Sequence, residues 1–195
     1  VDGKPILTRI LDWANKQGCE RGLILTGHLG EMFHSFSHEM DLIFVQEPEP
    51  LGTGGALWNA REYLENEFIL LWGDDFHPIN YESLISKHRI MNAEITMTVT
   101  EEHRCMNLKH QNGIVVEYDK TSPSDDYNGY EAGTSIVKKS VVEKFKKKGK
   151  WSWEETVYPA LSGKIVAHID NSKFWDIGTP KRLEILENFL KDGRT

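Results

Sequence analysis

Two aspartates lie at places where a folded chain can use carboxylates for chemistry. Asp74 follows the apolar run of residues 68–72 after a single glycine, and Asp176 lies within residues 174–179, Phe-Trp-Asp-Ile-Gly-Thr. Mg²⁺ prefers oxygen ligands and usually takes one or two carboxylates together with phosphate oxygens and water. The two aspartates would suffice for such a site if the fold brings them together. Their positions fit equally well two carboxylates that cap a turn and a loop.

A glycine-rich turn offers a second kind of chemistry. Residues 49–57, Glu-Pro-Leu-Gly-Thr-Gly-Gly-Ala-Leu, follow an apolar run that ends at Val45, and they lead into helix-like sequence. Glycines let backbone N–H groups approach a ligand, and the N-terminus of a helix favours anions. Turns are rich in glycine for steric reasons in any α/β protein, so this segment alone is a weak signal.

The elements that must position these residues alternate along the first half of the chain. Apolar spacing predicts helices at residues 5–17, 31–36, 54–64 and 81–91. Short apolar runs predict strands at residues 22–25, 41–45, 68–72 and 95–99. This alternation predicts an α/β fold with a Rossmann-like, mainly parallel sheet flanked by helices. Ligands of such sheets bind outside the carboxyl ends of the strands, so residues that follow strands are the first candidates.

The second half is less regular and indicates an α+β arrangement. Strands are predicted at residues 114–118, 134–137, 165–169 and 174–177, and helices at residues 140–148, 154–161 and 180–190. No linker, repeat or low-complexity tract divides the chain, so we predict a single domain over residues 1–195. The chain begins at Val1 directly before helix-like sequence, and we expect this domain to be N-terminally truncated.

Composition and charge argue against several classes of partner. The 195 residues include 23 Lys and Arg against 30 Asp and Glu, a formal net charge of −7. This balance does not favour nucleic acid. No apolar run approaches the roughly 20 residues of a bilayer-spanning helix, and no leader precedes Lys4, so we expect a cytoplasmic protein without a membrane partner. Cys19 and Cys105 lack metal or redox spacing and are expected to be reduced thiols.

Five short segments, taken together and in this order, resemble the sugar-1-phosphate nucleotidyltransferase family. They are residues 3–6, 49–56, 73–74, 131–134 and 174–180, with the sequences Gly-Lys-Pro-Ile, Glu-Pro-Leu-Gly-Thr-Gly-Gly-Ala, Gly-Asp, Glu-Ala-Gly-Thr and Phe-Trp-Asp-Ile-Gly-Thr-Pro. The second and the last are the more specific, and together the five span nearly the whole chain. The resemblance is strongest to guanylyltransferases that act on mannose 1-phosphate or heptose 1-phosphate.

The resemblance implies transfer of a nucleotidyl group from a nucleoside triphosphate, with GTP the best guess, to a sugar 1-phosphate, with release of pyrophosphate. It implies that Asp74 and Asp176 hold Mg²⁺, that Lys120 pairs with the sugar phosphate, and that these three residues are catalytic. It places the nucleotide at Gln46, Gly52, Thr53 and Gly73, and the sugar at Ala132, Gly133 and Glu154 or Glu155, with the irregular half of the fold binding the sugar.

Two departures from the family pattern qualify these expectations. The family opens with a strand and a loop of the form Gly-x-Gly-Thr-Arg, followed by a lysine, and these bind the triphosphate. This sequence contains neither, and Lys4 matches the later Lys-Pro pair instead. Residues 104–111 also differ from the glycine-containing strand of the relatives. Loss of the first strand would expose strand edges, so aggregation or a homo-oligomer is expected.

Two other functions remain compatible with the sequence. A non-catalytic regulatory protein would bind a sugar nucleotide without turnover. A nucleotide-sugar-dependent glycosyltransferase would need an acceptor and would release no pyrophosphate.

Overall fold

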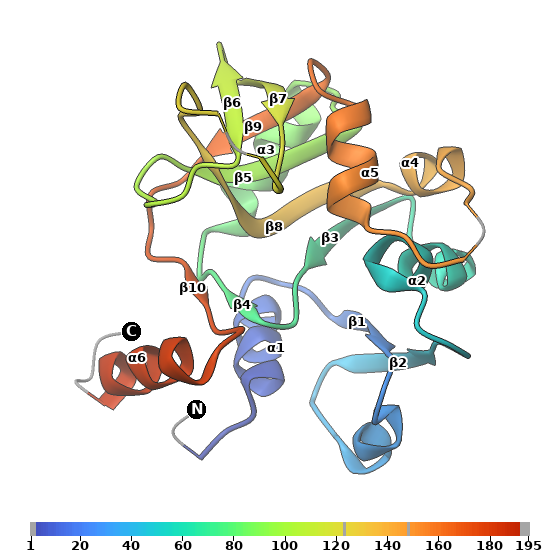
Figure 1. The fold of residues 1–195 in the computed structure, drawn as a ribbon. Helices are drawn as coiled ribbons and strands as arrows, with labels where there is room; N and C mark the ends of the chain where they lie inside the picture. Colours follow the sequence, from blue (N-terminus) through green and yellow to red (C-terminus); the bar gives the residue numbers. More distant parts are fainter. Residues whose placement is uncertain (1–2, 123, 148, 192–195) are drawn as a thin grey trace.

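The first described element is helix α1 (Ile6–Lys16), which buries one stripe of side chains because Ile10, Leu11 and Ala14 recur at helical spacing. The computed structural model describes residues 3–122, 124–147 and 149–191, and Figure 1 shows its elements. Strands β1 (Arg21–Thr26) and β2 (Asp41–Gln46) follow and pair in parallel. The connection between them contains the 3-10 helix η1 (Gly30–Ser35).

The main sheet has six strands in the order β3-β8-β5-β9-β7-β6. Their bounds are β3 (Glu67–Leu71), β8 (Tyr130–Lys138), β5 (Ile95–Thr100), β9 (Ile165–Ile169), β7 (Ile114–Tyr118) and β6 (Leu108–Gln111). Strand β5 pairs in parallel with β9, whereas β8 runs antiparallel to both β3 and β5. Every residue of β5 is buried, so this strand lies at the centre of the core.

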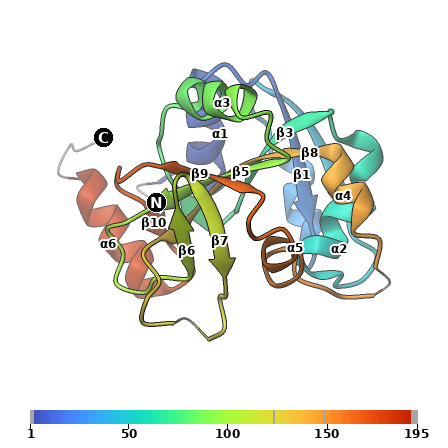
Figure 2. The ribbon, with the colours of Figure 1, turned by 90° about the horizontal axis from the view of Figure 1, so that it is seen from above.

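Helices cover both faces of this sheet. Figure 2 shows α3 (Tyr81–Ile90) on one face and α5 (Trp153–Ala160) on the other. Helix α5 also contacts α2 (Gly52–Asn59), which in turn contacts α4 (Lys139–Lys144) and η2 (Arg61–Tyr63). Trp153, Val157 and Tyr158 of α5 are fully buried in the larger core cluster. Among the described residues, no helix combines the length and apolar character that crossing a membrane requires.

A short ladder joins two distant parts of the chain. Strand β4 (Asp75–Phe76) pairs antiparallel with β10 (Trp175–Asp176), in a register that sets Asp176 opposite Asp75. Helix α6 (Pro180–Lys191) follows β10. This ladder brings the segment around Asp176 next to the turn that follows β3.

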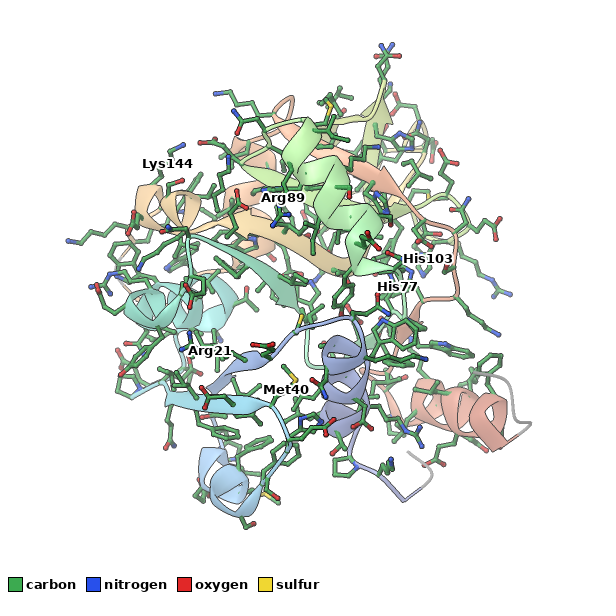
Figure 3. The ribbon with its side chains drawn as sticks, turned by 180° about the vertical axis from the view of Figure 1, so that it is seen from behind. Arg21, Met40, His77, Arg89, His103 and Lys144 are labelled. Atoms are coloured by element: carbon green, nitrogen blue, oxygen red, sulfur yellow. The ribbon has the colours of Figure 1, made fainter. Side chains whose placement is uncertain are left out.

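An apolar cavity of about 780 Å³ lies between the β1–β2 pair and the six-stranded sheet, and residues of both β1 and β3 line it. Its lining includes consecutive positions of each strand, residues 21–25 and 67–71. Because neighbouring residues of a strand point to opposite faces, a cavity that touches every one of them lies beside the strand edge. Within the described residues, β1 pairs only with β2 and β3 only with β8, so each strand has one unpaired edge. Figure 3 shows Arg21 and Met40 at the β1 side of this cavity.

The predicted α/β class, with a central sheet flanked by helices, is confirmed. All predicted helices and strands have a counterpart; residues 31–36 form a 3-10 helix, and the helix predicted at residues 54–64 divides into α2 and η2. The sheet is more mixed than the expected mainly parallel one, because β8 inserts between β3 and β5 and runs antiparallel to both. Strands β4 and β6 were not predicted, since both are too short or too polar to show an apolar run.

Candidate active site

Asp74 and Asp176 approach each other at the carboxyl end of β3. A Cβ atom on Gly178 would lie 3.2 Å from Asp176 Oδ1 and 3.3 Å from Asp74 Oδ2, so both carboxylates border the same small volume. The backbone N–H of Ile177 donates to the Asp74 carbonyl at 2.9 Å and fixes the two segments together. The fold therefore brings Asp74 and Asp176 together, which their spacing in the sequence could not decide.

Asp176 has a cationic partner on the following helix. Arg182 Nη1 donates a hydrogen bond to Asp176 Oδ2, and the Gly178 backbone N–H donates to Asp176 Oδ1 at 2.9 Å. The Arg182 backbone N–H lies 3.4 Å from Thr179 Oγ1, the arrangement of an N-cap. Arg182 therefore offsets part of the negative charge of this carboxylate pair.

Asp75 forms the inner side of the site. It lies opposite Asp176 in the ladder, and a Cβ on Gly133, whose φ is +74°, would lie 2.5 Å from Asp75 Oδ2. Gly133 is thus the residue that allows this carboxyl to approach β8. The pKa of Asp75 rises to about 8 through burial first and then through the neighbouring negative charges of Asp74, Glu131 and Asp176.

Glu131 is a buried acid held by two donors. Trp72 Nε1 donates to Glu131 Oε1 at 3.1 Å, and the Gly133 backbone N–H donates to the same oxygen at 3.2 Å. Burial raises the pKa of Glu131 to about 7, and the hydrogen bond from Trp72 opposes this shift. The indole of Trp72 thereby connects the end of β3 to the start of β8.

Lys120 is connected to the glycine turn through Glu154. Lys120 Nζ donates to Glu154 Oε1, and Thr53 Oγ1 donates to Glu154 Oε2 at 3.4 Å. Partial burial lowers the pKa of Lys120, but the hydrogen bond and charge of Glu154 more than compensate, so the pKa is raised overall. Glu155 is exposed, and its backbone N–H donates to Ser152 Oγ at 3.2 Å. Of the two glutamates proposed for the sugar, the structure joins Glu154 to the other predicted residues.

The glycine turn packs against Trp151. The Gly54 backbone N–H donates to the Trp151 carbonyl at 3.1 Å, and the Trp151 N–H donates to the Leu51 carbonyl at 2.9 Å. A Cβ on Gly54 would lie 2.2 Å from the Trp151 ring, and one on Gly52, whose φ is +71°, would lie 2.6 Å from the Trp151 carbonyl oxygen. These glycines make room for a neighbouring tryptophan. The nucleotide contact at Gly52 stays a prediction.

The remaining predicted residues lie around this centre. Gln46 is exposed at the end of β2, and Gly73 is exposed next to Asp74 with no other atom within 4 Å of its Cβ position. Ala132 is fully buried, and its carbonyl accepts a hydrogen bond from His77 Nδ1 at 3.1 Å. Ala132 therefore offers a ligand no exposed side-chain surface.

The donor set suits a magnesium ion shared with phosphate. Among the described residues, no three His, Cys, Asp or Glu side chains are arranged to hold a metal on their own. Mg²⁺ needs only one or two carboxylates when phosphate oxygens and water complete its octahedron. Asp74 and Asp176, both bordering the Gly178 position, fit that requirement.

The sequence analysis did not single out Asp75, Glu131 or Trp72 as members of this cluster. Asp75 joins it through its pairing with Asp176, which connects distant parts of the chain. Glu131 belongs to a motif that the resemblance used, but only its burial and its bond from Trp72 reveal its altered acidity. The adjacency of two acids after a strand was the one local signal for Asp75.

The fold and the site define an α/β protein that gathers carboxylates and a lysine at one end of its sheet. The family model for nucleotidyl transferases matches residues 1–192, and the chain belongs to this family. The predicted sugar-1-phosphate nucleotidyltransferase family is thereby confirmed.

Named relatives agree with this family. The chain is 27% identical over 193 residues to the D-glycero-α-D-manno-heptose 1-phosphate guanylyltransferase of Aneurinibacillus thermoaerophilus, covering 92% of this chain and 82% of that protein. It is 26% identical over 196 residues to the mannose-1-phosphate guanylyltransferase of Mycobacterium tuberculosis, covering 92% of this chain and 54% of that protein. The chain thus spans about half the length of the second relative. The crystal structure of HddC from Yersinia pseudotuberculosis superposes with a TM-score of 0.82 and 25% identity, over 97% of this chain and 87% of that one.

Proposed function

We propose that this protein transfers a nucleotidyl group from a nucleoside triphosphate to a sugar 1-phosphate and releases pyrophosphate. The observation that carries the proposal is the convergence of Asp74 and Asp176 on the Gly178 position. We propose GTP as the nucleotide donor and mannose 1-phosphate or heptose 1-phosphate as the acceptor, because the two relatives described above are guanylyltransferases named for these sugars.

Each polar group has a role in this reaction. Mg²⁺, held by Asp74 and Asp176, would neutralise phosphate charge as it develops. Lys120, oriented by Glu154, pairs with the phosphate of the sugar. Positioning and electrostatics supply most of the catalysis in phosphoryl transfer, so the proposal needs no side-chain nucleophile. The proposed nucleotide contacts are Gln46, Gly52, Thr53 and Gly73, and the proposed sugar contacts are Gly133, Glu154 and Glu155. The contact predicted for Ala132 is dropped, because this residue is fully buried.

The test is pyrophosphate release with Mg²⁺, measured for each nucleoside triphosphate against mannose, heptose and glucose 1-phosphates. We expect release with GTP, and a loss of about 100-fold or more in kcat for Asp74→Asn and for Asp176→Asn. Asp41→Asn, which removes an exposed carboxylate at the start of β2, is the matched control and keeps its activity. Normal turnover in either site variant would contradict the metal assignment.

Pyrophosphate release, together with binding and consumption of GDP-sugar, separates the two competing functions. A chain that binds GDP-sugar and releases no pyrophosphate under any combination is a sugar-nucleotide-binding regulatory protein. A chain that consumes GDP-sugar only in the presence of an acceptor is a glycosyltransferase.

A further inference from the structure

Four aromatic rings form a cluster beside the carboxylates. The His103 and Tyr130 rings are stacked, with centroids 3.8 Å apart. Phe174 lies 6.5 Å from His103 and 5.9 Å from Tyr130, and its ring meets that of His77 edge-on at 5.7 Å. Figure 3 labels His77 and His103, which lie on the same side of the molecule, between α3 and α6. We call these four residues the aromatic wall.

The β4–β10 ladder brings the aromatic wall close to the acidic pair. In this ladder Asp75 lies opposite Asp176 and Phe76 opposite Trp175. His77 and Phe174 are the residues directly beyond the ladder, each two positions along the chain from one of the aspartates. Two residues of extended chain span at most about 7 Å, which is the scale of one sugar ring.

The electrostatics of Tyr130 reflect this proximity. Burial raises the pKa of Tyr130 to about 12, and the negative charges of nearby carboxylates add to the shift. Those carboxylates are Glu131, Asp75 and Asp176. The phenol therefore lies within electrostatic reach of the residues that border the proposed phosphate site.

The aromatic wall is preorganised and partly open. His103 Nδ1 lies 2.9 Å from the Cys105 carbonyl oxygen and 3.2 Å from the Cys105 backbone nitrogen, which fixes the imidazole. Only His77 of the four is buried; His103, Tyr130 and Phe174 are each half-buried. Three of the four rings therefore keep surface that a ligand can reach.

The position of the wall favours the sugar over the nucleobase. Tyr130 begins β8, three residues before Gly133, which is proposed for the sugar. Helix α2, proposed for the nucleotide, lies on the other side of the fold from β10, to the right in Figure 1 where β10 is to the left. A sugar ring has faces of C–H groups that pack on aromatic rings and hydroxyls that bond to their polar edges.

We propose that His103, Tyr130 and Phe174 form the surface that contacts the sugar ring of the sugar 1-phosphate and selects which sugar is used. This inference rests on the proposed function and adds residues that determine its acceptor. The Tyr130 hydroxyl and the His103 imidazole meet hydroxyl groups at the end of the sugar remote from the phosphate.

The experiment measures kcat and KM separately for the sugar phosphate and for the nucleotide in His103→Ala and Tyr130→Phe. We expect the KM for the sugar phosphate to rise about 3- to 10-fold in His103→Ala, with the KM for the nucleotide and kcat nearly unchanged. The ratio of kcat/KM between mannose 1-phosphate and heptose 1-phosphate also shifts. Tyr63→Phe, on the exposed tyrosine of η2, is the control and changes none of these values.

A direct binding measurement keeps the two proposals distinguishable. NMR follows the His103 imidazole resonances, assigned from the His103→Ala spectrum, as mannose or heptose 1-phosphate is added; we expect a saturable change. Turnover with an unaltered KM for the sugar phosphate in both variants would overturn the aromatic wall and leave the proposed function intact. A wild-type chain that neither releases pyrophosphate nor shifts the His103 resonances overturns both.

Discussion

Buried acids at the site behave differently from the exposed ones, and Glu131 is the clearest case. It has almost no exposed surface, and burial raises its pKa from 4.5 to about 7. An acid whose pKa is higher in the folded state keeps its proton up to a higher pH there than in the unfolded chain. Protonated Glu131 therefore stabilises the fold at low pH, and this contribution is lost as the pH rises through about 7.

Glu131→Gln is expected to reduce the pH dependence of the free energy of unfolding. In the wild type this free energy falls between pH 4.5 and about 7, with a slope from this group of at most about 1.4 kcal/mol per pH unit. Glutamine keeps the acceptor for Trp72 and does not titrate. Urea unfolding across this range measures the slope. Asp126→Asn, which removes an exposed acid whose pKa is lowered, leaves it unchanged; an equal slope in Glu131→Gln contradicts the assignment.

The sequence pointed to candidate site residues that belong to local motifs and did not single out acids that are defined by their contacts. Asp74 and Asp176 stand in recognisable segments, and the fold brings both to the Gly178 position. Asp75 acquires its altered acidity from Asp74, Glu131 and Asp176, two of which are distant in the chain. No local pattern carries that information, because burial and charge depend on the packed neighbours.

At the scale of elements, helix α2 shows how one tryptophan determines a glycine pattern. Glycine is normally unfavourable within a helix, by about 1 kcal/mol relative to alanine. Here a Cβ on Gly54 would lie 2.2 Å from the Trp151 ring. The steric conflict outweighs the gain in helix propensity, so glycine is the residue that lets α2 and the segment before α5 pack together.

Gly54→Ala is expected to destabilise the protein by about 1–3 kcal/mol, the usual cost of overpacking. Thermal unfolding measures the change. Gly73→Ala is the control, since no atom lies within 4 Å of its Cβ position. Trp151→Leu introduced with Gly54→Ala should make the alanine less costly than it is alone. A Gly54→Ala variant as stable as the wild type would show that the turn does not pack in this way.

Elements with a strong apolar pattern were predictable, and the shortest ones were not. The apolar run at residues 68–72 predicted β3 nearly to its ends, and the helical spacing of apolar residues within 81–91 predicted α3. Strand β4 contains two residues, and only its pairing with β10 defines it. Strand order is likewise a long-range property, so the sequence did not predict that β8 lies antiparallel between β3 and β5.

At the scale of the whole molecule, the apolar cavity between β1 and β3 is the main departure from a closed core. Unpaired strand edges with apolar surroundings are templates for pairing with another chain. The lining residues 21–25 and 67–71 combine such edges with side chains such as Leu23, Ile24 and Leu70. The edges of β1 and β3 are therefore the places where we expect another chain to pair.

The chain of 22.4 kDa is expected to self-associate with increasing concentration. Ile24→Lys introduces a charge beside the edge of β1 and should weaken this association, because edge lysines oppose strand pairing. Sedimentation velocity over a dilution series measures it. Val116→Lys on β7, an exposed position outside the cavity, is the control. A wild-type chain that stays monomeric at every concentration contradicts this expectation.

The two-residue ladder between β4 and β10 gives ligand binding a mechanical consequence. Docking of β10 orders the short segment that follows β9, and the two residue pairs of the ladder return little of the chain entropy that this costs. A ligand that bridges Asp74 and Asp176 binds only when β10 is docked, so mass action favours the docked form. Amide exchange and proteolysis within α6 should slow as the site fills. Protection of the C-terminal helix would then measure how much of the site is occupied, without any label near the reacting atoms.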